Sequence, residues 1–218
     1  MPGLPRCHGP DRGKILTDPH AEYYSLLRAC FFNPPDGKLL KTLNAHSQNP
    51  PAFPNHPDIT DGWRKIATFF NEHSGEEAMT ALAQAHYLLF DNPLGSKMEP
   101  YASHYLEGIR QGMPLVNMRG FLIQWGLVPE RELFRDFEDH AVFMLDCLVK
   151  IAELADREGQ HWEEAMEQLL VEHVLPWMPV FLSDLETADE DLECGGFYAG
   201  LARIGRGLLA LEAQVLQQ

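Results

Sequence analysis

The chain has 218 residues, 45% of them hydrophobic and 22% charged, with a formal net charge of −15 from 17 Lys and Arg against 32 Asp and Glu. This composition excludes a disordered chain and is sufficient for one globular core. The negative charge disfavours nucleic acid and anionic membranes as partners and favours a basic peptide, although it would also serve solubility alone.

The cysteines and the N-terminus indicate the compartment. No two of the 4 cysteines have CxxC spacing, so neither a zinc motif nor a disulfide framework is expected, and Cys30 and Cys147 are expected to be buried thiols. Residues 1–18 contain Pro and Gly but no apolar stretch of signal-peptide length, and no window predicts a membrane span. We therefore expect a flexible tail over 1–18, one domain over 19–218, no stable membrane insertion and a cytoplasmic location.

Helical periodicity runs through almost the whole chain, and alternating strand patterns are nearly absent. A first helix is expected after Thr17-Asp18-Pro19, ending at Pro34-Pro35, followed by a short helix over about 38–45. The proline-rich stretch 49–57 predicts a loop, and a further helix should begin near residue 58.

The middle of the chain carries clear helix signals. Ser74 with Glu77 three residues later predicts a capping box that opens the next helix. A break is expected over 91–100 and a partly helical stretch over 101–112. Pro114 predicts the beginning of another helix, which Gly126 should end.

The second half contains the most apolar helix, over about 139–157, which we place at the centre of the core. A helix over 161–174 should follow. The acidic run 184–193 is interpreted as a linker, and a last helix is expected over 196–216. About ten helices and no sheet predict an all-α globule.

Catalytic and metal motifs are incomplete. The chain has 10 histidines but one Glu-x-x-His spacing, Glu158 with His161, where a di-iron bundle needs two. No nucleophile elbow, dinucleotide-binding or phosphate-binding loop is present. We therefore expect no enzyme, no metal and no cofactor. The alternative is a helical metalloenzyme or metal-binding protein, with candidate ligands His86, His104, His140 and Glu138.

An acidic cluster, Asp136-Phe137-Glu138-Asp139-His140, precedes the most apolar helix. Carboxylates at a helix N-terminus are stabilised by the helix dipole, and Asp136 or Asp139 could cap the helix. One interpretation is a well-capped buried helix. The other is a recognition site for guanidinium groups.

Four segments, in this order, resemble the TorD/DmsD/NarJ family of redox-enzyme maturation chaperones: residues 100–106, 136–140, 177–181 and 196–198. The cluster keeps the Asp and His of the family's Glu-Pro-x-Asp-His signature but lacks its proline. Leu89-Phe90 match the end of an aromatic-x-x-Leu-Phe segment, in which His86 takes the aromatic position. Both departures are compatible with a divergent subgroup.

The resemblance implies an all-helical chaperone with a hinge near 127–139, as a monomer or a hinge-exchanged homodimer. Such proteins bind the twin-arginine signal peptide and the apo form of a molybdopterin oxidoreductase, assist cofactor insertion and prevent premature export. Guanine nucleotide is a further ligand proposed for some members.

A twin-arginine peptide joins two guanidinium groups to an apolar stretch, so its receptor needs carboxylates beside an apolar groove. The candidates for the charged part are Asp136, Glu138, Asp139 and His140. The candidates for the groove are Trp63, Phe70, Leu89, Phe90 and Tyr101. Each of these large side chains is also a candidate for core packing. A scaffold without a peptide groove is a third hypothesis.

Overall fold

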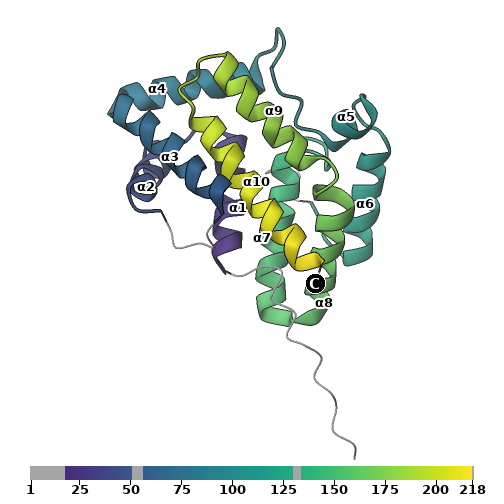
Figure 1. Cartoon of the computed structure of the whole chain (residues 1–218). Coiled ribbons are helices and arrows are strands. Elements are labelled where there is room, and N and C mark those ends of the chain that lie inside the picture. Colours follow the sequence, from purple (N-terminus) through teal and green to yellow (C-terminus); the bar gives the residue numbers. More distant parts are fainter. Residues whose placement is uncertain (1–17, 51–55, 130–133, 218) are drawn as a thin grey trace, which may run out of the picture.

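The computed structural model describes residues 18–50, 56–129 and 134–217 (Figure 1). Within these residues there are ten α-helices and no strand, so the predicted all-α fold class is confirmed. The helices are α1 (Asp18–Phe32), α2 (Gly37–Gln48), α3 (Pro57–Glu72), α4 (Gly75–His86), α5 (Ala102–Glu107), α6 (Met113–Trp125), α7 (Ala141–Glu158), α8 (Gln160–Gln168), α9 (Met178–Asp191) and α10 (Phe197–Leu216). Two π-helical segments, η1 (Tyr87–Asp91) and η2 (Leu169–Val174), continue α4 and α8. The predicted tail lies outside the described residues, apart from Asp18 at the start of α1.

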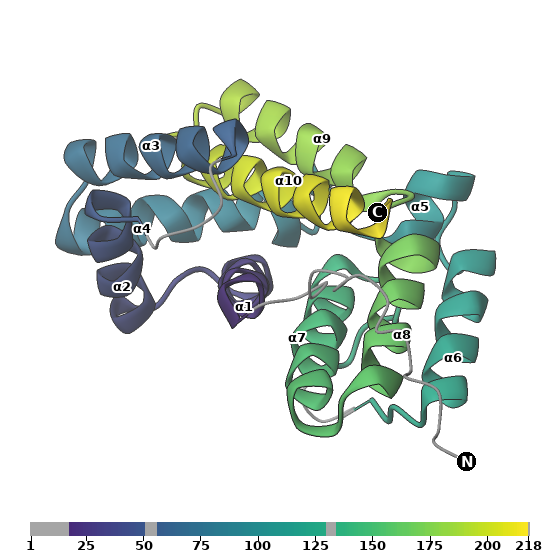
Figure 2. The same ribbon diagram turned by 60° about the horizontal axis from the view of Figure 1, so that its bottom comes forward.

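The helices form two groups joined by long central helices. Helices α2, α3 and α4 lie on one side, and α5 to α8 lie on the other (Figure 2). The C-terminal helix α10 packs along α3 and α9, and α1 packs against α7 and α10 (Figure 1). Helix α1 therefore lies between the two groups, next to α7.

Glycines allow α3 and α10 to approach closely. A Cβ atom on Gly62 would lie 2.5 Å from the carbonyl oxygen of Gly200, and a Cβ on Gly200 would lie 2.7 Å from that of Gly62. Both distances are far below van der Waals contact, so only glycine fits at this crossing. Gly205 and Gly207 of α10 also allow close packing, since a Cβ on either would lie within 3 Å of side chains of neighbouring helices.

Local signals place several helix ends correctly. Pro114 lies in the first turn of α6, and Gly126 ends that helix in the left-handed conformation, with φ 67°. The predicted capping box at Ser74 is wrong, because its side chain makes no capping hydrogen bond. The Glu77 amide instead donates to the Ser74 carbonyl oxygen at 3.1 Å.

The interpretation of 184–193 as an acidic linker is wrong, because most of this run lies within α9. Two of its acids, Glu186 and Asp189, interact with groups from α10. Glu186 is paired with Arg203 at 2.5 Å and with Arg206 at 2.7 Å. Asp189 is fully buried and accepts a hydrogen bond from the Ala199 amide at 3.0 Å, and burial raises the pKa of Asp189 to about 6.

The predicted burial of α7 is confirmed, since nine of its residues are buried, although α10, with twelve buried residues, contributes more to the core. The thiols of Cys30 and Cys147 are buried as expected.

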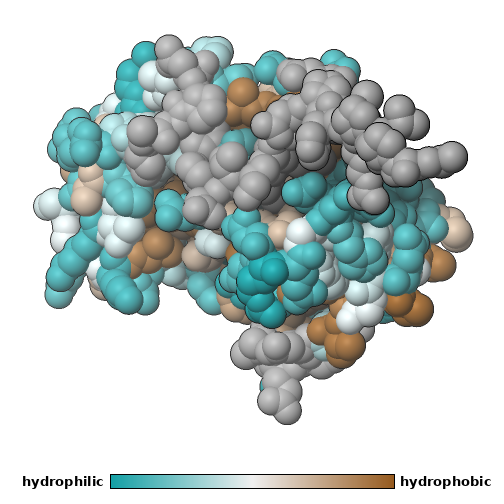
Figure 3. All heavy atoms as spheres, turned by 90° about the horizontal axis from the view of Figure 1, so that it is seen from below, coloured by the Kyte–Doolittle hydropathy of each residue, from teal (hydrophilic) through white to brown (hydrophobic). Residues whose placement is uncertain are grey.

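One face of the surface is largely hydrophilic, with small separate apolar patches (Figure 3). Among the helices of the described ranges, none combines the length and the apolar character needed to span a bilayer.

Candidate functional site

Two segments that the sequence singled out lie side by side. The Ala102 amide donates to the Asp139 carbonyl oxygen at 2.9 Å, and the Ala141 amide donates to that of Pro100 at 2.8 Å. Tyr101 and His140 thereby form an isolated antiparallel bridge. The segment before α5 and the acidic cluster before α7 therefore form one structural unit.

Asp139 has a structural position within this unit. It is 1% exposed, and its Oδ2 accepts hydrogen bonds from the Ser103 amide at 3.1 Å and the Ser103 hydroxyl at 2.5 Å. The same hydroxyl oxygen accepts from the Gly112 amide at 3.0 Å, at the start of α6. Asp139 therefore ties the beginnings of α5, α6 and α7 together.

Glu138 is also buried, at 2% exposure. Its carboxylate accepts from the Arg119 guanidinium on α6 at 3.0 Å, while the Arg119 side chain is about half exposed. This ion pair holds the acidic cluster against α6. Glu138 therefore meets an arginine of its own chain.

His140, and neither of the predicted aspartates, caps α7. Its Nδ1 accepts from the Val142 amide at 3.1 Å, which places the ring proton of the neutral form on Nε2. Burial lowers the pKa of His140 to about 4, although Asp136 and Asp139 oppose this shift. The imidazole is consequently neutral at pH 7.

Asp136 faces a pocket of about 620 Å³, which we call the polar pocket. Its Oδ2 accepts from the Tyr101 hydroxyl at 2.8 Å, and its Oδ1 accepts from the Phe137 amide at 2.7 Å. Burial and the bond to Asp136 raise the pKa of Tyr101, so the phenol stays neutral and donates. The polar pocket is lined by Phe31, Phe32, Phe90, Asp91, Ser96, Met98, Pro100, Tyr101, Arg110, Phe134, Arg135, Asp136, His140 and Val142.

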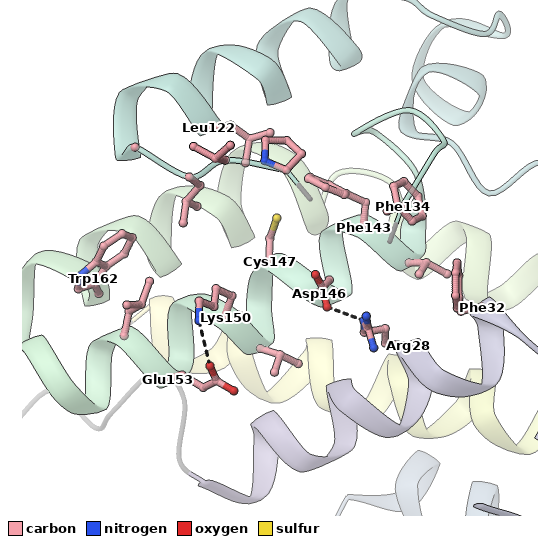
Figure 4. Close-up of a pocket in the computed structure, with 17 residues that line it drawn as sticks. Arg28, Phe32, Leu122, Phe134, Phe143, Asp146, Cys147, Lys150, Glu153 and Trp162 are labelled. Atoms are coloured by element: carbon pink, nitrogen blue, oxygen red, sulfur yellow. Dashed lines mark hydrogen bonds and ion pairs between the residues drawn. The ribbon is translucent and has the colours of Figure 1, made fainter. Parts of the chain in front are cut away.

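A second pocket of about 590 Å³, the apolar pocket, lies between α1, α7, α8 and the end of α6. Its walls include Leu122, Phe143, Cys147 and Trp162 (Figure 4). The charged lining groups are paired with one another, as in Arg28 with Asp146 at 2.5 Å and Lys150 with Glu153 at 3.4 Å. The surface available to a ligand is therefore mainly apolar.

The two pockets share three lining residues, Phe32, Phe134 and Val142. They therefore adjoin along α1 and α7, and together they form a surface that is polar at one end and apolar at the other. We call this the α1–α7 groove. Its long axis follows α7, whose first turn begins at the acidic cluster.

The structure brings together only part of the predicted site. Phe90, Tyr101, Asp136 and His140 line the polar pocket. Trp63, Phe70 and Leu89 are buried in the core, at 2%, 8% and 0% exposure. The Trp63 indole donates to the Tyr23 hydroxyl at 3.1 Å, which is an interaction within the core.

Several groove residues were absent from the sequence-based set, including Phe32, Asp91, Phe134 and Arg135. Asp91 directly follows the Leu89-Phe90 match and could have been found from that position. Phe134 and Arg135 directly precede the acidic cluster and could have been found in the same way, whereas Phe32 comes from a distant part of the chain and no local pattern marks it.

The candidate ligands of the metalloenzyme alternative do not converge. His140 caps α7, Glu138 is paired with Arg119, and His86 is bonded to Asp91. Within 18–50, 56–129 and 134–217, no three His, Cys, Asp or Glu side chains are grouped so that they could hold a metal ion.

Comparison with known proteins connects this geometry to a family. The model of the nitrate reductase delta subunit family matches residues 56–183, which include the acidic cluster and most of the groove. The chain is also similar to the Tat proofreading chaperone DmsD of Salmonella typhi, with 27% identity over 200 residues, or 90% of each chain. These findings do not support the metalloenzyme alternative. The chain belongs to the nitrate reductase delta subunit family of redox-enzyme maturation chaperones, as its resemblance to the TorD/DmsD/NarJ proteins predicted.

Proposed function

We propose that this chain is a cytoplasmic chaperone without enzymatic activity, which binds the twin-arginine signal peptide and apo form of a molybdopterin oxidoreductase. Bound in this way, the client would be held for cofactor insertion and kept from premature export. Family membership and the name of the DmsD relative support this proposal. The observation that carries it is that the polar and apolar pockets adjoin at three shared lining residues, Phe32, Phe134 and Val142.

The groove gives the peptide a direction. The arginine pair would occupy the polar pocket, where Asp136 and Asp91 offer carboxylates. The apolar stretch that follows the arginines would extend along α7 into the apolar pocket, towards Trp162. A net charge of −15 on the chain would speed the encounter with a basic peptide, and this effect weakens with salt.

The predicted hinge near 127–139 remains part of the proposal. The groove is lined by described residues from both halves of this hinge. Leu127, Val128 and Pro129 line the apolar pocket, and Phe134 lines both pockets. A movement at this hinge would therefore change the width of the groove. Residues 130–133 of the hinge lie outside the described ranges.

The proposal is tested by titrating the protein with a synthetic twin-arginine leader of a molybdopterin oxidoreductase in a calorimeter. Phe32, at the junction of the pockets, is 44% exposed, so Phe32→Ser should leave the fold intact. Losing this apolar contact should weaken binding about tenfold. The matched control is Leu94→Ser, which removes a side chain that is 95% exposed and outside both pockets. Absence of binding by the wild type, or equal losses in both variants, would refute the proposed function.

A further inference from the structure

Asp91 is a carboxylate of the polar pocket that neither the signature nor the periodicity indicated. It is the last residue of η1, the π-helical segment that continues α4, and its side chain is 63% exposed. Leu89, two residues earlier, is fully buried and fixes this segment in the core. Asp91 is therefore accessible to a ligand and is carried by an anchored element.

His86 holds the Asp91 side chain in place. Its imidazole is 2% exposed, with Nδ1 2.9 Å from Asp91 Oδ2 and Nε2 3.3 Å from the Phe31 carbonyl oxygen. Both partners only accept hydrogen bonds, and the shorter contact assigns the proton of the neutral ring to Nδ1, donating to Asp91. The ring also lies 5.1 Å from that of Phe90.

This arrangement explains the departure at the aromatic position of the Leu-Phe segment. A phenylalanine or tyrosine ring at position 86 would fill a similar space but could not donate to Asp91 from the Nδ1 position. In this chain the residue that replaces the aromatic ring is the one that orients a pocket carboxylate. His86 is therefore a positioning residue for Asp91.

Two carboxylates, those of Asp91 and Asp136, line the polar pocket from different elements. Asp136 precedes α7 and lines the pocket, and its carboxylate accepts hydrogen bonds from the Tyr101 hydroxyl and the Phe137 amide. Arg110 is already paired with Glu99 at 2.5 and 2.9 Å. Among the described lining residues, Arg135 is the other arginine, and it is exposed.

Two adjacent arginines in an extended peptide project to opposite sides of its backbone. One carboxylate on one wall of a pocket therefore cannot serve both guanidinium groups. We propose that Asp91, oriented by His86, binds one arginine of the twin-arginine pair, and Asp136 binds the other. This inference rests on the proposed function and names the two contacts that read the pair.

Calorimetric double-mutant cycles test the assignment. The wild type, Asp91→Asn and Asp136→Asn are titrated with the twin-arginine peptide and with two peptides in which one arginine is glutamine. Each variant should bind the parent peptide about threefold to tenfold more weakly. Asp91→Asn should be insensitive to loss of one arginine and Asp136→Asn to loss of the other.

Two controls separate positioning and net charge from direct contact. His86→Phe should weaken peptide binding as much as Asp91→Asn does. In the Asp91→Asn background it should cause no further loss of affinity, whereas a purely structural effect of His86→Phe would weaken binding further. Glu167→Gln, which alters the net charge equally on an exposed site of α8 outside both pockets, should bind like the wild type. Circular dichroism checks that each variant is folded.

The outcomes distinguish this inference from the proposed function. If the wild type does not bind the peptide, both are wrong. If the wild type binds and requires both arginines, but Asp91→Asn retains wild-type affinity or couples to neither arginine, only the assignment of Asp91 is wrong.

Discussion

Asp139 is the carboxylate whose role the structure changes most, and its substitution separates stability from peptide binding. Both hydrogen bonds from Ser103 go to Oδ2, while Oδ1 is buried without a hydrogen-bond partner among the described residues. Asp139→Asn can place its amide oxygen where Oδ2 lies and retain both bonds. Asp139→Ala removes the acceptor altogether.

The magnitudes follow from these contacts. Asp139→Asn exchanges a charged acceptor for a neutral one and buries an unpaired NH₂ group, so the free energy of unfolding should fall by about 1 kcal/mol. Asp139→Ala leaves the Ser103 amide without its partner and loses two bonds to a charged group. This loss is partly offset because the substitution also removes a buried charge. The free energy of unfolding of Asp139→Ala is therefore expected to fall by about 3 kcal/mol.

Urea unfolding followed by circular dichroism measures both values, and Ser103→Ala completes a double-mutant cycle with Asp139→Asn. Peptide titration under conditions where the variants are folded should show little loss of affinity. In contrast, Asp136→Asn should lose affinity with a smaller change in stability. A stable Asp139→Ala would refute the structural role of Asp139, and a folded Asp139→Asn that binds tenfold more weakly would indicate that Asp139 contacts the peptide.

Three further predictions concern packing, pH and charge. Gly200→Ala should destabilise the fold by about 2 kcal/mol because its Cβ meets the α3 backbone, whereas Gly120→Ala, with nothing within 4 Å, should stabilise it by about 0.5–1 kcal/mol; thermal melts with equal effects would contradict this. The pKa of Asp189 is raised from 3.8 to about 6, so the wild type loses stability as pH rises through this range. The free energy of unfolding of Asp189→Asn should therefore rise relative to that of the wild type between pH 4 and 6, by at most about 1.4 kcal/mol per pH unit. Urea titrations that give a pH-independent difference in stability between the two proteins would contradict this sign. Arg135→Gln removes the cation nearest in sequence to Asp136 and should tighten peptide binding about twofold to fivefold, as checked by calorimetry at low salt; weaker binding would instead assign Arg135 an attractive contact.

Residues close in sequence determined most of the helices. Apolar periodicity, Pro114 and Gly126 place α6, and the apolar run at the beginning of α7 predicts its place in the core. These signals depend on the local chain alone, because a proline restricts its own backbone and a left-handed glycine ends its own helix. The order of four short segments was also sufficient to indicate the family.

The acidic run at the end of α9 shows what local patterns miss. Six acids between 184 and 193 would repel one another in an isolated helix. In the fold, Glu186 meets Arg203 and Arg206, and Asp189 accepts from the Ala199 amide. These partners come from α10, and Glu190 pairs with Lys65 of α3 at 2.7 Å, so the helix is stabilised by contacts that only the packed structure provides.

The same distinction divides the candidate site. The sequence by itself determined that an acidic cluster precedes a buried helix and that the chain resembles a chaperone family. Only the tertiary structure decided which acids are accessible: Glu138 and Asp139 are buried by α5 and α6, while Asp136 and Asp91 line the groove. The physical reason is that exposure depends on which elements pack over a side chain, and the elements around this groove come from α1, η1 and α7, far apart in the sequence.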